Sequence, residues 1–281
     1  MLGGIVQTIR SCVGDADLML IGAAARDLLL QHLHGIDPRR KTNDVDLAFA
    51  VADWPAYETM KAALVASGEF EPSKRIHHRL LCKIGLPIDI VPFGGIESPN
   101  AEIAWPPDGN DIMSVIGYVE ARSAADDILL PGDEPLAVPT LPMFALLKLF
   151  AWEDRYRIQP GKDATDLLFV LDNAFRTMGL ELLHETAPKL LEADDFDVDL
   201  AGAWMLGADV RTTIDRFSRR CQAILAKVST TLEREVDPDG SLTLIGQLHA
   251  NDPERARLKL IAFGNGVHQV AMLTRKGFGK A

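Results

Sequence analysis

The chain has 281 residues, of which 47% are hydrophobic and 25% are charged. This composition is typical of a globular protein with one large domain or two modest ones, and it excludes a mainly disordered chain. Forty acidic residues against 29 lysines and arginines give a formal net charge of −11, which argues against non-specific coating of nucleic acid and leaves only binding through a local basic patch.

The cysteines and the apolar segments bear on the compartment in which the protein works. Cys12, Cys82 and Cys221 are far apart and form no Cys-x-x-Cys pair, which is typical of reduced thiols and argues against a cysteine zinc site. The N-terminal segment lacks the unbroken apolar stretch of a signal peptide. The most apolar segment, 144–152, carries Lys148 and is far shorter than the roughly 20 residues that cross a bilayer. We therefore expect a cytoplasmic protein with no membrane partner.

In chain order, the first half alternates strands with helices. The apolar residues 18–22 predict a buried strand, and the alanine- and leucine-rich residues 23–34 predict a helix that ends at Gly35. A second strand is expected over 44–51, followed by a helix over 54–67.

A hairpin and a long loop region follow. Residues 76–85 and 87–93 predict two strands joined by a turn at Gly85–Pro87. Residues 94–139 are rich in glycine, proline, aspartate and asparagine, which indicates long loops. Within them we expect two strands, near 113–121 and 126–130.

The second half has a helical pattern. A helix is predicted from Thr140 onward, with Thr140 as its N-cap and Pro142 in its first turn. We therefore expect an α/β domain over 1–137 and a mostly helical C-terminal domain over 138–281. Further helices are predicted at 162–177, 178–193, 200–207, 209–235 and 253–263.

Two aspartates at the start of the second predicted strand are the first candidate site residues. Asp44 and Asp46 lie two residues apart, so both point to one face of the strand. Two ionised carboxylates repel each other unless a cation or a hydrogen-bond network neutralises them. A Mg²⁺ ion takes oxygen ligands, typically one or two carboxylates plus substrate phosphates. The pattern therefore suits a metal–nucleotide site, although two solvated aspartates at a strand end have the same pattern.

A small turn precedes these aspartates. Gly22 lies between the first predicted strand and helix, and Ala23 begins a run of three alanines. In such a turn, backbone N–H groups and the helix N-terminus can meet phosphate oxygens, and Arg26 is one turn further along. Tight packing of the helix on the sheet explains the small residues as well, and an ion pair with Asp27 on the helix surface explains the arginine.

A third carboxylate follows in the hairpin. Asp89 alternates with β-branched residues in the apolar strand 87–92, where it is either solvent-facing or part of a site. If this strand lies beside 44–50, Asp89 joins Asp44 and Asp46. The three carboxylates would then make a two-metal site, or a metal site with a base, for phosphoryl chemistry.

These motifs resemble the nucleotidyltransferase fold shared with DNA polymerase β: a glycine turn, an Asp-x-Asp on the next strand and an aspartate in a later apolar strand. The segment is also similar to the head motif of tRNA nucleotidyltransferases (GGxxRD…DxD), with Ala23 in place of the usual second glycine or serine. The resemblance implies an α/β core with a mixed sheet, and transfer of a nucleoside monophosphate from an NTP to an acceptor hydroxyl. It implies Mg²⁺, or Mn²⁺, at Asp44, Asp46 and Asp89, with Asp89 as the base. It implies nucleotide contacts at Gly22, Ala23 and Arg26.

The segment 146–171 resembles the two C-terminal motifs of the AbiEii-like nucleotidyltransferase toxins, which have a lysine followed by an arginine on a helix and then (R/K)D-x-x-D-L. Lys148 and Arg155 share one helix face, as do Asp163 and Asp166. The resemblance implies that Lys148 contacts the triphosphate, and that Asp163, or else Asp166, orients it or the substrate. From the residues alone, Lys148 also fits a lysine whose stem alone is buried, and the aspartates fit favourable charge at a helix N-terminus.

The toxin family implies a tRNA 3′ end or another cellular target as acceptor, and an antitoxin protein as partner. Three alternatives remain: an enzyme that adenylylates a small molecule such as an antibiotic, a tRNA CCA-adding enzyme, and a non-catalytic nucleotide- or RNA-binding protein on the same fold. The CCA-adding enzyme ranks lower, because no RRDFT-like segment follows Asp89 and no EDxxR-type helix is present. The basic cluster Arg75, His77, His78 and Arg79 fits a solvated edge, or the lining of an acceptor channel.

Overall fold

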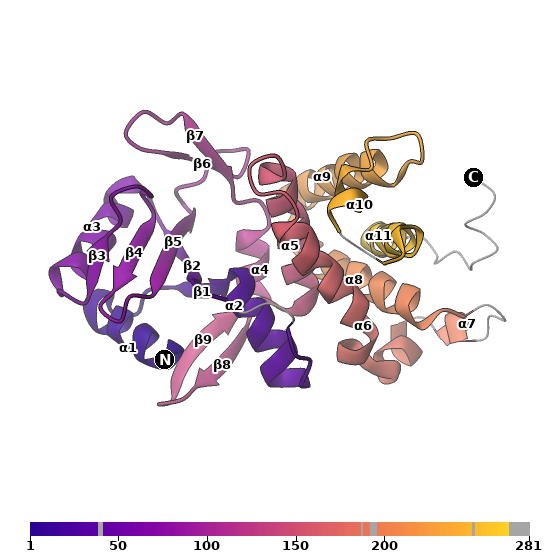
Figure 1. The fold of residues 1–281 in the computed structure, drawn as a ribbon, viewed down its shortest axis with the longest axis horizontal. Helices are drawn as coiled ribbons and strands as arrows, with labels where there is room; N and C mark the ends of the chain where they lie inside the picture. Colours follow the sequence, from indigo (N-terminus) through magenta and orange to yellow (C-terminus); the bar gives the residue numbers. More distant parts are fainter. Residues whose placement is uncertain (39–41, 187, 192–195, 249–250, 270–281) are drawn as a thin grey trace. The chain divides into compact units, whose positions relative to one another are not determined.

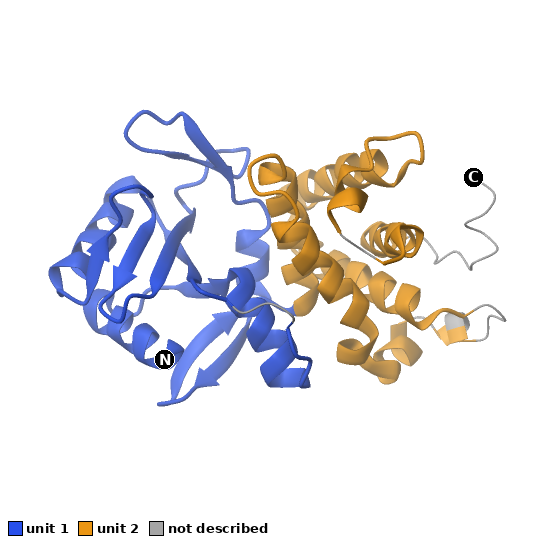
Figure 2. Cartoon of the chain, viewed as in Figure 1, with its two compact units in different colours: residues 1–140 blue, residues 141–281 orange. Residues whose placement is uncertain are grey.

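The computed structural model describes residues 1–38, 42–186, 188–191, 196–248 and 251–269 (Figure 1). The chain divides into two compact units, residues 1–140 and 141–281 (Figure 2). The first unit is mixed α/β and the second is helical, so the predicted fold class is confirmed.

The first unit is built on a seven-stranded sheet in the order β3–β4–β5–β2–β1–β9–β8 (Figure 1). β5 pairs with β2 and β1 with β9 in parallel, while the other neighbours are antiparallel, so the sheet is mixed. The strands are β1 Leu18–Ile21, β2 Val45–Val51, β3 Phe70–Pro72, β4 Arg79–Cys82, β5 Pro87–Gly94, β8 Asp126–Leu130 and β9 Glu134–Val138.

The remaining elements of this unit are four α-helices, a π-helical turn and a separate two-stranded ribbon. They are α1 Leu2–Val13, α2 Gly22–Asp27 with its π-helical continuation η1 Leu28–His32, α3 Trp54–Ala66, α4 Tyr118–Ser123, and the ribbon β6 Glu102–Trp105 with β7 Asp111–Ser114.

The central strands form because they are apolar on both faces. All four residues of β1 are buried, as are the six interior residues of β5, which is the pattern of strands covered on both sides. Helix α3 begins where the Asp53 carboxylate accepts the backbone N–H of Ala56, a typical N-cap. The fully buried Tyr57 of α3 donates its hydroxyl to the carbonyl of Ile90, which anchors this helix to β5.

Several predicted elements have nearly the predicted bounds, including β8, the hairpin of β4 with β5, and α3. The strand expected near 113–121 is wrong: β7 ends at Ser114, and α4 starts after Gly117, whose φ of 91° turns the chain. Strand β9 and helix α1 were not predicted. Strand β9 pairs with the preceding strand β8 and also with β1, which is distant in sequence, and the local pattern of β9 does not reveal these partners.

The second unit contains seven helices among its described residues. They are α5 Leu141–Arg155, α6 Lys162–Thr186, α7 Pro188–Leu191, α8 Val198–Ile214, α9 Ser218–Val236, α10 Thr243–Gln247 and α11 Pro253–Val267. The predicted break after residue 177 is present as a kink at Gly179 inside α6. The expected helix over 178–193 includes residues 187, 192 and 193, which lie outside the described residues. None of the described helices is both long enough and apolar enough to span a membrane.

The break predicted after residue 207 is wrong, because α8 continues to Ile214. Gly207 does not end the helix; it lets α8 approach α11 closely. A Cβ added at Gly207 would overlap the carbonyl oxygen of Phe263, and one added at Gly266 would overlap that of Trp204. The two helices therefore pack backbone against backbone, and the glycines are required by that packing.

This packing predicts that Gly207→Ala lowers the free energy of unfolding by about 1–3 kcal/mol, since the two helices must move apart. Gly246→Ala in α10 is the matched control, because nothing lies within 4 Å of its added Cβ. The control should be neutral or stabilising by up to about 1 kcal/mol, the difference in helix propensity. Urea unfolding measures both, and equal effects would contradict the close packing.

Candidate functional site

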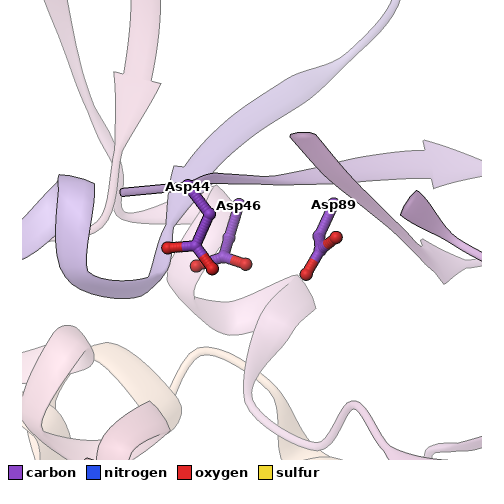
Figure 3. Close-up of side chains that lie close together, drawn as sticks. All are labelled: Asp44, Asp46 and Asp89. Carbon is purple, nitrogen blue, oxygen red and sulfur yellow. The ribbon is translucent and has the colours of Figure 1, made fainter. Parts of the chain in front are cut away.

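Three carboxylates converge at one end of the central strands. Asp44 directly precedes β2, Asp46 lies in β2, and Asp89 lies opposite Asp46 in the parallel neighbour β5. One carboxylate oxygen from each residue lies within 4.8 Å of the other two, and the three side chains point to the same side of the sheet (Figure 3). The two strands that carry Asp46 and Asp89 are thus neighbours in the sheet, as this convergence requires. Asp89 is buried, whereas Asp44 and Asp46 are half-buried.

Gly22 lies directly against this cluster. Strand β1 pairs antiparallel with β2 so that Ile21 is opposite Asp46, and the chain then turns at Gly22 with a φ of 69°. A Cβ at this position would overlap the Asp46 carboxylate, 2.7 Å from its Cγ. Glycine is therefore required twice: for a left-handed backbone conformation and for the space that the carboxylate occupies.

Arg26 is held by its neighbour on the helix. It is only 3% exposed and donates to Asp27 Oδ1 from Nε at 2.9 Å and from Nη2 at 2.5 Å. Asp27 also accepts the Thr42 hydroxyl at 2.8 Å. Arg26 thus forms the ion pair with Asp27 that the sequence offered as an alternative to a phosphate contact. The pair is partly buried, and through Thr42 it connects the helix to the segment before Asp44. Ala23 lies in the first turn of α2 and is half-buried.

Arg79 is the residue at this site whose role the sequence did not single out. In the antiparallel hairpin it lies opposite Asp89, to which it donates Nε to Oδ1 at 2.6 Å and Nη2 to Oδ2 at 2.7 Å. Its Nη2 is also 3.6 Å from Asp44 Oδ2. The hydrogen bonds to Asp89 raise the pKa of Arg79 above its ordinary value. The signal in the sequence was the hairpin itself, whose register pairs these two residues.

An aromatic and basic wall lies next to Asp89. His78 Nε2 is 3.8 Å from Asp89 Oδ2, and its ring lies 5.0 Å from the ring of Trp105. Burial lowers the pKa of His78 below 6.5, and the opposing effect of Asp89 is smaller, so the imidazole is neutral at pH 7. Lys61 donates to the carbonyl of His77 at 2.7 Å. The side of the site formed by β4 thus offers a guanidinium and a neutral imidazole.

The predicted residues of the helical unit form a cluster of their own within that unit. Lys148 Nζ lies 3.0 Å from Asp163 Oδ1 and 2.7 Å from Asp166 Oδ2. Arg155 donates to the other side of Asp163, with Nε 2.7 Å from Oδ2 and Nη2 2.8 Å from Oδ1. Lys148 is only 4% exposed, so its charged end does not reach the surface. The alternative in which only the aliphatic part of the side chain is buried is therefore wrong. Asp163 does lie in the first turn of α6.

The titration of this cluster follows from its geometry. Burial alone would lower the pKa of Lys148, but Asp166 and Asp163 outweigh it and the pKa lies above the ordinary value. Burial alone would raise the pKa of Asp163, but Arg155 and Lys148 outweigh it and the pKa lies well below 3.8. Lys148 and Asp163 therefore stay charged at neutral pH, and each cation of the cluster faces a carboxylate.

No protein-family model matches the chain, and no curated protein matches it. Among solved structures, the chain is similar to the solution structure of the antibiotic-resistance factor ANT(2'')-Ia, with 17% sequence identity and a TM-score of 0.37. The match covers 68% of this chain and 95% of that one.

The contact between Gly22 and Asp46 predicts a difference between two glycine substitutions. Gly68→Ala is the control, because Gly68 has a φ of 72° but nothing within 4 Å of an added Cβ. Both variants adopt a left-handed backbone at a cost of about 1–3 kcal/mol. Gly22→Ala should lose more free energy of unfolding in urea, since it also displaces the Asp46 carboxylate. Equal losses would show that the carboxylate moves aside without cost.

The second cluster predicts a pH dependence of stability. The pKa of Asp163 is lower in the folded state than in the unfolded state, where it is near 3.8. Asp163 therefore contributes fully to the free energy of unfolding above pH 3.8, and this contribution is lost as the pH falls through the pKa of the folded state. Asp163→Asn should cost up to about 3–5 kcal/mol at pH 7, because Arg155 loses its carboxylate partner and the buried Lys148 keeps only Asp166. The gap between variant and wild type should narrow as the pH falls below 3.8.

Glu69→Gln in the first unit is the control. Its carboxylate is 44% exposed and pairs with Lys83, which is 61% exposed, so the substitution should cost less than about 1 kcal/mol. Thermal unfolding between pH 7 and pH 3 measures all three proteins. Equal losses in the two variants would mean that the Asp163 cluster contributes no more than a surface pair.

Proposed function

We propose that the protein is a metal-dependent nucleotidyltransferase, which transfers a nucleoside monophosphate from an NTP to an acceptor hydroxyl and releases pyrophosphate. The observation that carries the proposal is the convergence of Asp44, Asp46 and Asp89 beside the turn at Gly22. This geometry joins a set of metal ligands to a loop whose backbone can approach a phosphate.

The donor set fits a hard divalent cation. All three candidate ligands are carboxylates, with oxygens within 4.8 Å of one another, and oxygen donors favour Mg²⁺ or Mn²⁺. Without an ion, the three carboxylates and the guanidinium of Arg79 sum to a formal charge of −2, and this excess negative charge attracts a divalent ion. The Lys148 cluster has two cations and two carboxylates, so its formal charge is already zero and it attracts no ion.

The proposed reaction needs mainly positioning and charge neutralisation. Asp44 and Asp46 would hold the metal, which supplies neutralising charge to the phosphates when bound. Asp89 would complete the ligand set and accept the proton of the attacking hydroxyl. The backbone of Gly22 and Ala23 would face the phosphates, and Arg26, one turn further along α2, would support them.

The proposed roles of Lys148, Asp163 and Asp166 are less direct. A contact between Lys148 and a triphosphate requires its ion pairs with both aspartates to open. Asp163 would remain paired with Arg155, while the buried Asp166 would lose the partner at 2.7 Å. The geometry therefore favours a supporting role for this cluster, in which Asp163 orients Lys148 and Arg155.

The acceptor is proposed from a resemblance of the sequence. Segment 146–171 resembles two motifs of the AbiEii-like toxins, and we extend the proposal to a cytoplasmic toxin-type enzyme. Its acceptor would be a tRNA 3′ end or another cellular target, and its partner an antitoxin protein.

The proposal predicts the behaviour of Asp46→Asn. Without metal its melting temperature should not fall, because the substitution relieves repulsion between carboxylates. The rise in melting temperature with Mg²⁺ and ATP should disappear, and transfer should fall by orders of magnitude. Transfer is measured with each labelled NTP, Mg²⁺ and total RNA, protein or metabolite extract, which also identifies the acceptor.

Glu71→Gln is the matched control, since Glu71 is an exposed carboxylate on β3 of the same sheet. It should bind and transfer as the wild type does. If Asp46→Asn instead loses stability but keeps metal–nucleotide binding and transfer, the aspartate is structural and the nucleotidyltransferase proposal is wrong. Mg²⁺-dependent ATP binding without transfer to any extract would favour the non-catalytic alternative.

A further inference from the structure

Arg79 grips one of the three carboxylates with both arms of its guanidinium. The two hydrogen bonds to Asp89 are 2.6 and 2.7 Å long, which is the bidentate geometry of strong arginine–carboxylate pairs. The same Nη2 lies 3.6 Å from Asp44. One guanidinium therefore supplies positive charge to two of the three residues that would hold a metal.

A divalent ion and this guanidinium compete for the same place. An ion held by all three carboxylates must approach oxygens of Asp89 that already accept from Arg79, and it would lie a few ångströms from a fixed positive charge. The ion and the guanidinium are both positive, and they repel each other strongly at that distance because Asp89, which both contact, is buried. The two cations therefore weaken each other's binding to Asp89.

The side chain of Arg79 has room to leave. It is 26% exposed, and its backbone is held in β4 by pairing with β5, so the guanidinium can turn into solvent while the strand stays in place. When the guanidinium leaves, Asp89 loses its ion pair with Arg79, and the bound ion supplies positive charge to that carboxylate instead.

We propose that Arg79 is the resident counter-ion of the carboxylate cluster, and that a divalent ion binds only by displacing it from Asp89. This inference rests on the proposed metal site and adds the residue that sets its affinity. The metal-binding state is the one in which Arg79 has released Asp89. The measured dissociation constant is therefore the intrinsic constant divided by the fraction of molecules in that state.

The first test is Mn²⁺ titration calorimetry on the full chain and three variants. Arg79→Gln should tighten Mn²⁺ binding by at least about tenfold, since a charged hydrogen bond no longer has to be broken. Arg79→Lys keeps the charge but loses the fork, so it should bind Mn²⁺ more tightly than wild type and less tightly than Arg79→Gln. Lys83→Gln, which removes an exposed pair with Glu69, should bind as wild type does.

The second test observes Arg79 in the wild-type protein and does not depend on any variant being stable. The Nε–H signal of Arg79 in a ¹⁵N NMR spectrum is identified by its absence in Arg79→Lys. Saturating Mg²⁺ should move this signal from a hydrogen-bonded to a solvent-exposed position. A signal that keeps its position with Mg²⁺ bound would overturn the proposal.

The outcomes separate this inference from the proposed function. If wild type, Arg79→Gln and Arg79→Lys bind Mn²⁺ equally, the displacement is wrong while the metal site stands. If Arg79→Lys matches wild type and only Arg79→Gln binds more tightly, charge alone acts and the displacement is again wrong. If none of these proteins binds Mn²⁺, the metal site fails and the inference fails with it.

Discussion

Three carboxylates crowded together at the end of two parallel strands are the constraint on which the α/β unit depends. Their oxygens lie within 4.8 Å of one another, and at such distances ionised carboxylates are stable only beside compensating positive charge. The protein supplies part of that charge through Arg79. The remainder is the excess that makes the cluster a candidate for a divalent cation.

The backbone around the cluster is organised to create this crowding. Parallel pairing of β2 with β5 places Asp46 opposite Asp89, and antiparallel pairing of β1 with β2 brings the turn at Gly22 against the same carboxylate. The hairpin of β4 with β5 adds Arg79 from the other side. Four strands thus meet around the cluster, and the Asp46 carboxylate fits against Gly22 only because that residue has no side chain.

The helical unit handles buried charge in the opposite way. Lys148 and Arg155 face Asp163 and Asp166, so positive and negative groups are matched one to one. Such a closed network stabilises α5 against α6 only as long as every member is present, because an isolated buried charge is costly. The two ionic clusters contain similar residue types, but only the first has unbalanced charge, and the proposed ligand site lies there for that reason.

The sequence by itself determined the elements with strong local patterns: the buried strands, the glycine turn, the hairpin and the helical second half. Asp44 and Asp46 share a face by strand periodicity alone, so their proximity needed no tertiary information. Local patterns failed where partners distant in sequence decide the outcome. Strand β9 pairs in parallel with β1, which lies far earlier in the chain, and Gly207 remains helical where α11 packs on it.

Only the tertiary structure decided which charges meet. The order of strands in the sheet brought Asp89 to Asp46, and the register of the hairpin paired Arg79 with Asp89. The tertiary structure also showed that Lys148 is buried beside two carboxylates. The sequence, an apolar helix with one lysine, was equally consistent with a charged end at the surface. The physical reason is that electrostatic interactions depend on distances across the fold, which strand order and helix packing set and which spacing along the chain does not encode.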